Sequence, residues 1–181
     1  MFRIGQEEKD AVARVIDSKQ LFKCNDGPLK ETENCEREMR ELFGVEHAVL
    51  MTSGFAALTS ALIGMGIGPG DEVIIPAYTY IATAISVVNA GAMPVIAEVD
   101  ETLMIDPADV EGKITERTKA IIPVHMMGYP CNMDAIMTIA NKHGLKVLED
   151  ACQANGAKFG GKRLGTIGDA GALSFNYFKI I

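Results

Sequence analysis

Short apolar runs alternate with helical patterns along most of the chain. From Ala48 onward, runs rich in β-branched residues recur between segments whose apolar residues have helical spacing. This order is typical of βαβ units with helices on both faces of a mostly parallel sheet, so we predict the α/β class. The predicted strands are AVLMTS from Ala48, EVIIPAYT from Glu72, PVIAEV from Pro94, TKAIIPVHM from Thr118, KVLEDA from Lys146 and GALSFN from Gly171.

Two of the intervening helices have recognisable ends. In NMDAIMTIANKHG, Asn132 is the predicted N-cap and Gly144 follows the last turn. In DPADVEGKI, Asp106 is the predicted N-cap and Pro107 occupies the first helical position, which proline favours. The residues before Ala48 differ, since they read as an amphipathic helix, a loop FKCNDGPLKET and a charged helix ENCEREMRELFG.

Charge and cysteine usage exclude several classes. The 181 residues carry a net charge of −7, which argues against binding nucleic acid, because that needs clustered Lys and Arg. Four cysteines occur without a C-x-x-C pair, so neither a zinc site nor a disulfide framework is predicted, and a reducing cytoplasm is expected. No signal peptide is recognised, and the most apolar region, from Ala82 to Ala97, is too short for the roughly 20 residues of a membrane span.

Candidate chemistry lies at the predicted carboxyl ends of the strands, where open parallel sheets bind ligands. Ser53 and Gly54 lead directly into a helix, whose free N–H groups suit a phosphate; an ordinary serine N-cap explains the same residues. Tyr78 and Tyr80 follow the next strand and could stack on a flat ring or simply line its rim. His125 could donate to a ligand or satisfy a backbone carbonyl.

Two adjacent carboxylates, Glu149 and Asp150, end an otherwise apolar strand. A buried carboxylate needs a partner. Asp150 could face a ligand cation, both could bind Mg²⁺, or Asp150 could cap a following helix on which Gln153 lies one turn later.

The last predicted strand brings Ser174 and Lys179 to the same edge. A lysine among apolar neighbours loses solvation of its charged form, so its neutral amine becomes a nucleophile toward carbonyl groups. A lysine that lies along an apolar surface is the alternative. A phosphate site, a stacking aromatic, a carboxylate for a ring nitrogen and an imine-forming lysine together indicate pyridoxal 5′-phosphate.

The glycines of GMGIGPGDE do not support a dinucleotide site. They follow a helix and precede a strand, whereas the dinucleotide fingerprint follows a strand and opens a helix. We predict a helix terminator and turn.

The segment from TLMIDPADVEG to SFNYFK, together with TSGFAAL, GDEVIIPAYTYIATA and FKCNDGP, resembles the DegT/StrS family of pyridoxal-phosphate-dependent sugar aminotransferases. The resemblance covers nearly the whole chain and implies the aspartate aminotransferase-like type I fold. It implies residues 1–47 as a helical segment with a substrate-side loop and residues 48–181 as the cofactor-binding large domain. It also implies a homodimer in which L-glutamate aminates a nucleotide-linked keto-sugar for amino-sugar or polysaccharide biosynthesis; from charge and hydrophobicity we expect no nucleic-acid or membrane partner.

The resemblance also implies roles at matching positions. Lys179 matches the lysine that binds the cofactor as an imine, Asp150 the partner of the pyridine nitrogen and Gln153 the residue near the ring hydroxyl. The remaining matches are Ser174 as a phosphate ligand, Gly54 and Phe55 as backbone amides on the phosphate, and Tyr80 as the stacking aromatic. Phe55 departs from the usual threonine, which removes one hydroxyl contact. No metal is implied.

Length is the larger departure from the family. Relatives continue through a Gly-rich segment, a seventh, antiparallel strand and a smaller C-terminal domain, so we expect a truncated large domain. The alternative to an active aminotransferase is therefore an inactive remnant or one piece of a split enzyme.

Overall fold

The computed structural model describes residues 4–23 and 27–179 and divides the chain into two compact units, residues 1–50 and 51–181. The first unit holds α1 (Gln6–Ser18) and α2 (Glu31–Phe43), as predicted. Within it, Glu36 accepts hydrogen bonds from the Lys23 ammonium at 2.6 Å and from the Leu50 backbone N–H at 2.7 Å. These contacts join α2 to the chain segments on either side of it.

The second unit is built on a five-stranded parallel sheet in the order β2-β1-β3-β4-β7, which confirms the predicted class. Every residue of β1 is buried, because β1 lies inside the sheet and is covered on both faces. The strands are β1 (Glu72–Pro76), β2 (Met93–Ala97), β3 (Thr118–Ile121), β4 (Lys146–Asp150) and β7 (Ala170–Ala172).

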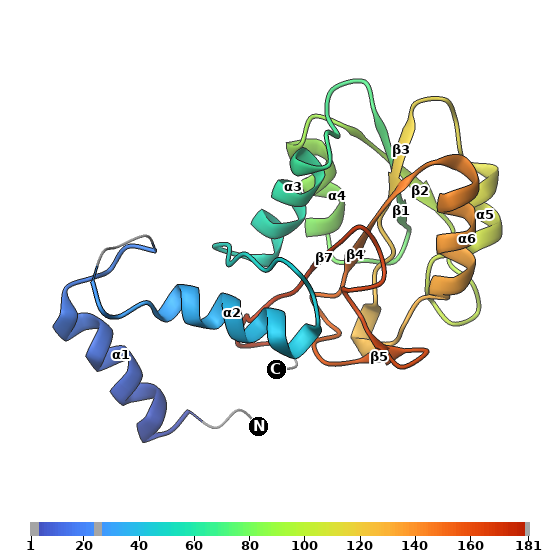
Figure 1. Cartoon of the computed structure of the whole chain (residues 1–181). Helices are drawn as coiled ribbons and strands as arrows, with labels where there is room; N and C mark the ends of the chain where they lie inside the picture. Colours follow the sequence, from blue (N-terminus) through green and yellow to red (C-terminus); the bar gives the residue numbers. More distant parts are fainter. Residues whose placement is uncertain (1–3, 24–26, 180–181) are drawn as a thin grey trace. The chain divides into compact units, whose positions relative to one another are not determined.

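Helices cover both faces of this sheet. Figure 1 shows α3 (Gly54–Gly64) and α4 (Ala82–Asn89) on one face, with α5 (Pro107–Gly112) and α6 (Met133–His143) on the other. The predicted caps of α5 and α6 are confirmed, since Asp106 accepts from the Ala108 N–H and Asn132 from the Ala135 N–H. No helix in the described part of the chain has the length and apolar character needed to cross a membrane.

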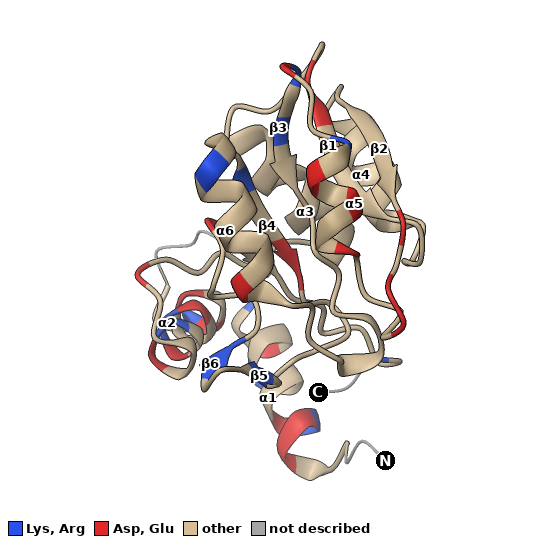
Figure 2. Cartoon of the chain, turned by 90° about the vertical axis from the view of Figure 1, so that its right-hand side faces the viewer, with Lys and Arg blue, Asp and Glu red and all other residues tan. Residues whose placement is uncertain are grey.

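Two local predictions are wrong. The run from Ala48 forms no strand, because it pairs with no strand among residues 4–23 and 27–179. No helix follows β4; residues 151–157 form turns that lead into a short antiparallel hairpin, β5 (Lys158–Phe159) and β6 (Lys162–Arg163). Lys and Arg gather on this hairpin (Figure 2), in a chain that is acidic as a whole.

A buried carboxylate ties the end of β4 to its surroundings. Glu149 has no exposed surface and accepts hydrogen bonds from His125 Nε2 at 3.1 Å and from the backbone N–H groups of Gly165, Ile167 and Gly168 at 2.9, 2.5 and 2.8 Å. His125 Nδ1 accepts from the Cys131 N–H, so its proton lies on Nε2 and points to Glu149. Both His125 nitrogens therefore serve the fold, through a carboxylate and a backbone N–H rather than through the backbone carbonyl that the structural alternative predicted.

The environment of Glu149 favours its charged form. Burial acts to raise its pKa, but the donors from His125 and the three backbone N–H groups outweigh burial and hold the pKa below its ordinary value. Since each carboxylate oxygen receives two donors, an apolar or amide replacement leaves buried N–H groups without acceptors.

We expect Glu149→Gln to lower the free energy of unfolding by about 3 kcal/mol, because an amide NH₂ group then faces buried donors. Urea unfolding measures this change. The matched control is Glu116→Gln, at an exposed position, which is expected to have an effect within about 0.5 kcal/mol. Equal stabilities of the two variants would contradict the role given to Glu149.

The contribution of Glu149 to stability should depend on pH. Because the folded-state pKa of Glu149 lies below the unfolded value near 4.5, its contribution to stability is complete above that pH and is lost as the pH falls through the folded-state pKa. Unfolding measured from pH 7 to pH 3 should therefore show a shallower pH dependence in Glu149→Gln than in the wild type. Parallel curves would refute this assignment.

Candidate active site

The candidate site lies at the carboxyl edge of the sheet, where the segments that follow β1, β4 and β7 meet the start of α3. All these strands are parallel, so their carboxyl ends share one edge. A Cβ atom built on Gly54, the first residue of α3, would lie 2.8 Å from Cys152 Sγ and 3.4 Å from Ser174 Cβ. The helix start therefore contacts the segments after both β4 and β7.

Asp150 is nearly buried and is held by two donors, one on each oxygen. Thr83 Oγ1 donates to Oδ2 at 2.8 Å, and the Cys152 N–H donates to Oδ1 at 3.2 Å. Successive residues of a strand point to opposite faces, so Asp150 points toward α4 while Glu149 points to His125. The two carboxylates do not converge, so the arrangement disagrees with the interpretation that both bind one Mg²⁺ ion.

The start of α3 offers backbone donors for an anion. The Ser53 hydroxyl caps the helix by accepting from the Ala56 N–H at 3.1 Å. The N–H groups of Gly54 and Phe55 lie in the first turn, where helix geometry provides no acceptor. Ser174, which is buried, lies beside them, and the missing side chain of Gly54 permits this close approach.

Lys179 and Tyr80 come together at the same edge. Lys179 Nζ lies 5.2 Å from the centroid of the Tyr80 ring, within the range of a cation–π contact. Tyr80 is 62% exposed, so much of its surface is accessible to a ligand, and the other predicted aromatic, Tyr78, is also exposed. Cys152 lies beside Asp150. Burial raises the pKa of its thiol, and the charge of Asp150 raises that pKa further, so the thiol stays protonated.

Gln153 is oriented by the turn after β3. Its Oε1 accepts from the Met127 N–H at 3.2 Å, and its Nε2 lies 3.5 Å from Met126 Sδ. Met127 has a left-handed backbone (φ 54°) in the short helix η1 (Met126–Gly128). Each end of the amide keeps capacity for a second hydrogen bond, so Gln153 can still offer an N–H donor to a ligand.

Two residues at this edge were not predicted. Thr83 lies in the first turn of α4, and its backbone N–H donates to the Tyr80 carbonyl oxygen at 3.0 Å. Asn155 Nδ2 donates to the Ser174 backbone oxygen at 2.7 Å and so joins the turns after β4 to the segment that carries Lys179. Local sequence offers no signal for either residue, because each acts through a partner far away in the chain.

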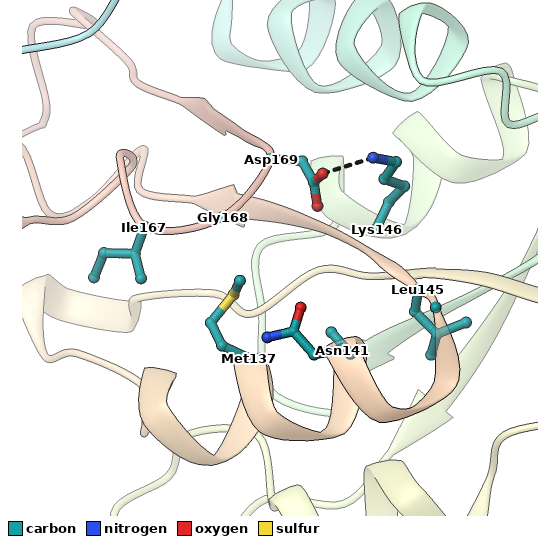
Figure 3. A pocket seen from close by; sticks show the side chains of 9 residues that line it. Met137, Asn141, Leu145, Lys146, Ile167, Gly168 and Asp169 are labelled. Atoms are coloured by element: carbon teal, nitrogen blue, oxygen red, sulfur yellow. Dashed lines mark hydrogen bonds and ion pairs between the residues drawn. The ribbon is translucent and has the colours of Figure 1, made fainter.

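A separate surface pocket of about 340 Å³ lies at the opposite edge of the sheet, between α6 and the segment before β7 (Figure 3). Its wall includes Met137, Asn141 and the ion pair of Lys146 with Asp169 at 2.7 Å. Since Lys146 begins β4 and Asp150 ends it, this pocket lies away from the candidate chemistry.

Gly54→Ala tests the close approach of α3 to Cys152. The new methyl group would overlap Sγ, so we expect a loss of about 1–3 kcal/mol in unfolding free energy. In a Cys152→Ala background the same change should cost less, because the overlapping atom is gone. A double-mutant cycle by chemical unfolding measures the difference, and a cycle with no coupling would contradict this packing.

Comparisons with known proteins agree with this architecture. The model of the DegT/DnrJ/EryC1/StrS aminotransferase family matches residues 3–181. GDP-perosamine synthase of Caulobacter vibrioides is 49% identical over 99% of this chain and 47% of its own length. The dTDP-3-amino-3,4,6-trideoxy-alpha-D-glucose transaminase of Streptomyces venezuelae is 46% identical over 93% of this chain and 44% of its own length.

Solved structures give the same result. The aminotransferase from Psychrobacter cryohalolentis superimposes with a TM-score of 0.93 at 44% identity, over 99% of this chain and 45% of that one. The PLP-form of the putative sugar aminotransferase Spr1654 from Streptococcus pneumoniae has a TM-score of 0.87 at 30% identity, over 98% of this chain and 48% of that one. The chain thus spans less than half the length of these relatives. It belongs to the DegT/DnrJ/EryC1/StrS aminotransferase family.

Proposed function

We propose that the whole protein is a pyridoxal-phosphate-dependent aminotransferase that transfers an amino group from L-glutamate to a nucleotide-linked keto-sugar. The observation that carries this proposal is the meeting of four separate chain segments at one sheet edge. These are the start of α3, the segment of Tyr80 and Thr83, the end of β4 at Asp150, and the segment from Ser174 to Lys179.

The residues present fit the cofactor. The first-turn N–H groups of α3, with Ser174 beside them, suit its phosphate, because a helix start combines free donors with a positive dipole end. Asp150, with one spare lone pair on each oxygen, suits a protonated ring nitrogen. Tyr80 would stack on the ring, and Gln153 would donate its amide N–H to the ring hydroxyl oxygen.

Each residue then has a defined task. Pyridoxal phosphate, when bound, supplies an electron sink for the carbanion that forms on the amino donor. Asp150 would hold a proton at the ring nitrogen through its negative charge. Lys179 would hold the cofactor covalently through Nζ, and its amine, when free, would move a proton to or from the reacting carbon. Ser53, Gly54 and Phe55 would keep the phosphate fixed.

The substrate assignment rests on the family and on the names of relatives. The two curated relatives carry the names of a GDP-perosamine synthase and of a transaminase of a dTDP-linked trideoxyglucose. From these names we infer that the substrate is a nucleotide-linked keto-sugar and that the protein acts in amino-sugar or polysaccharide biosynthesis. We further propose that glutamate is the amino donor and that the protein is a cytoplasmic homodimer. Residues 1–47 would contribute the substrate-side loop.

Lys179→Ala tests the covalent anchor in the protein at its full natural length. Reduction of the wild type with borohydride after incubation with pyridoxal phosphate should add the cofactor's mass to the peptide that contains Lys179. Lys179→Ala should lose this adduct and the visible absorbance band, with aminotransferase activity reduced at least a thousandfold, since covalent catalysis is lost. Peptide mass spectrometry and absorbance are the measurements.

Lys158→Ala is the matched control, because Lys158 is an exposed lysine of the β5–β6 hairpin in the same unit. It should retain both the adduct at Lys179 and the absorbance band. An adduct that persists elsewhere at full yield in Lys179→Ala would refute the assignment.

A further inference from the structure

A chain of hydroxyl groups leads from the surface to Asp150. Thr83, whose side chain is completely buried, places Oγ1 2.8 Å from Asp150 Oδ2. The half-buried Thr79 places its own Oγ1 2.7 Å from Thr83 Oγ1. Thr79 Oγ1 also lies 3.4 Å from the Tyr80 backbone oxygen, a much longer contact. The three side chains join the segment before α4, the first turn of α4 and the end of β4.

The chemistry of the groups fixes the direction of this chain. An ionised carboxylate only accepts, so the single hydroxyl proton of Thr83 points to Asp150. Thr83 Oγ1 must then accept at its short contact with Thr79, whose hydroxyl is the donor. Successive donors polarise one another, so Thr79 makes Thr83 a stronger donor to Asp150.

We propose that Thr83, supported by Thr79, is a positioning residue that makes Asp150 the weaker base toward a bound pyridinium ring, so that the shared proton stays on the ring nitrogen. This inference rests on the proposed cofactor. Through Asp150, the two threonines would determine how strongly the ring withdraws electrons, and neither side chain has to touch the cofactor.

Hydrogen bonds to the charged form of a carboxylate lower its proton affinity. Thr83 supplies one such bond to Oδ2, and the Cys152 N–H supplies another to Oδ1. The Thr83 hydroxyl does not titrate, so its effect on Asp150 persists in the loaded protein.

The test uses the full-length protein loaded with pyridoxal phosphate labelled with ¹⁵N in the ring. Thr83→Val keeps the shape of the side chain and removes its donor, so the ring ¹⁵N resonance should move toward that of neutral pyridine. Thr83→Ser retains the hydroxyl and should restore the wild-type resonance. Thr79→Val should produce a smaller displacement in the same direction, since it only weakens the donor.

Thr59→Val is the matched control. Thr59 is also buried, but its hydroxyl has no hydrogen-bond partner among the described residues. The same substitution there should leave the resonance unmoved. An unmoved resonance in Thr83→Val, or an equal displacement in Thr83→Ser, would overturn the proposal.

The outcomes separate this inference from the proposed function. If the wild type binds no cofactor at Lys179, the proposed function fails. If the wild type binds the cofactor at Lys179 but the ring ¹⁵N resonance is the same in Thr83→Val, only the inference fails. Should Thr83→Val not retain the cofactor, Thr79→Val decides, because an unmoved resonance in that variant refutes the hydroxyl chain.

Discussion

The buried carboxylate of Glu149 is the interaction on which the end of β4 depends. Four donors from the turn after β3 and from the loop before β7 converge on it, so three neighbouring parts of the sheet are fixed by one charge. Because adjacent strand residues face opposite sides, this anchoring directs Asp150 toward α4 and the candidate site. The buried Glu149 thus sets the direction of Asp150 at the candidate site.

The rest of the site is assembled on that frame. The segments that follow the parallel strands lie at one edge of the sheet. Because Gly54 has no side chain, α3 can start directly against Cys152 and Ser174. Lys179 reaches the Tyr80 ring from the far end of the chain. The arrangement brings together donors for an anion, an acceptor for a cation and an amine, each on a different segment, so the fold rather than any local motif creates the site.

The sequence predicted the parallel sheet and the caps of α5 and α6, because apolar periodicity and capping chemistry are local signals. It did not predict the loss of the strand from Ala48, since strand formation depends on a partner that local sequence does not reveal. The sequence singled out Asp150 as the possible partner of a ligand cation but left open a shared Mg²⁺ site with Glu149, which the opposite orientations of adjacent strand residues disfavour. Thr83 was missed because an interaction across 67 residues leaves no local pattern.

A crystal structure of the full-length protein with pyridoxal phosphate would show whether one sheet edge holds every part of the cofactor. We expect the phosphate at the start of α3 beside Ser174, the ring nitrogen at Asp150 and a covalent bond to Lys179 Nζ. Cofactor density at another edge of the sheet, or a ring nitrogen without Asp150 as its partner, would contradict this expectation.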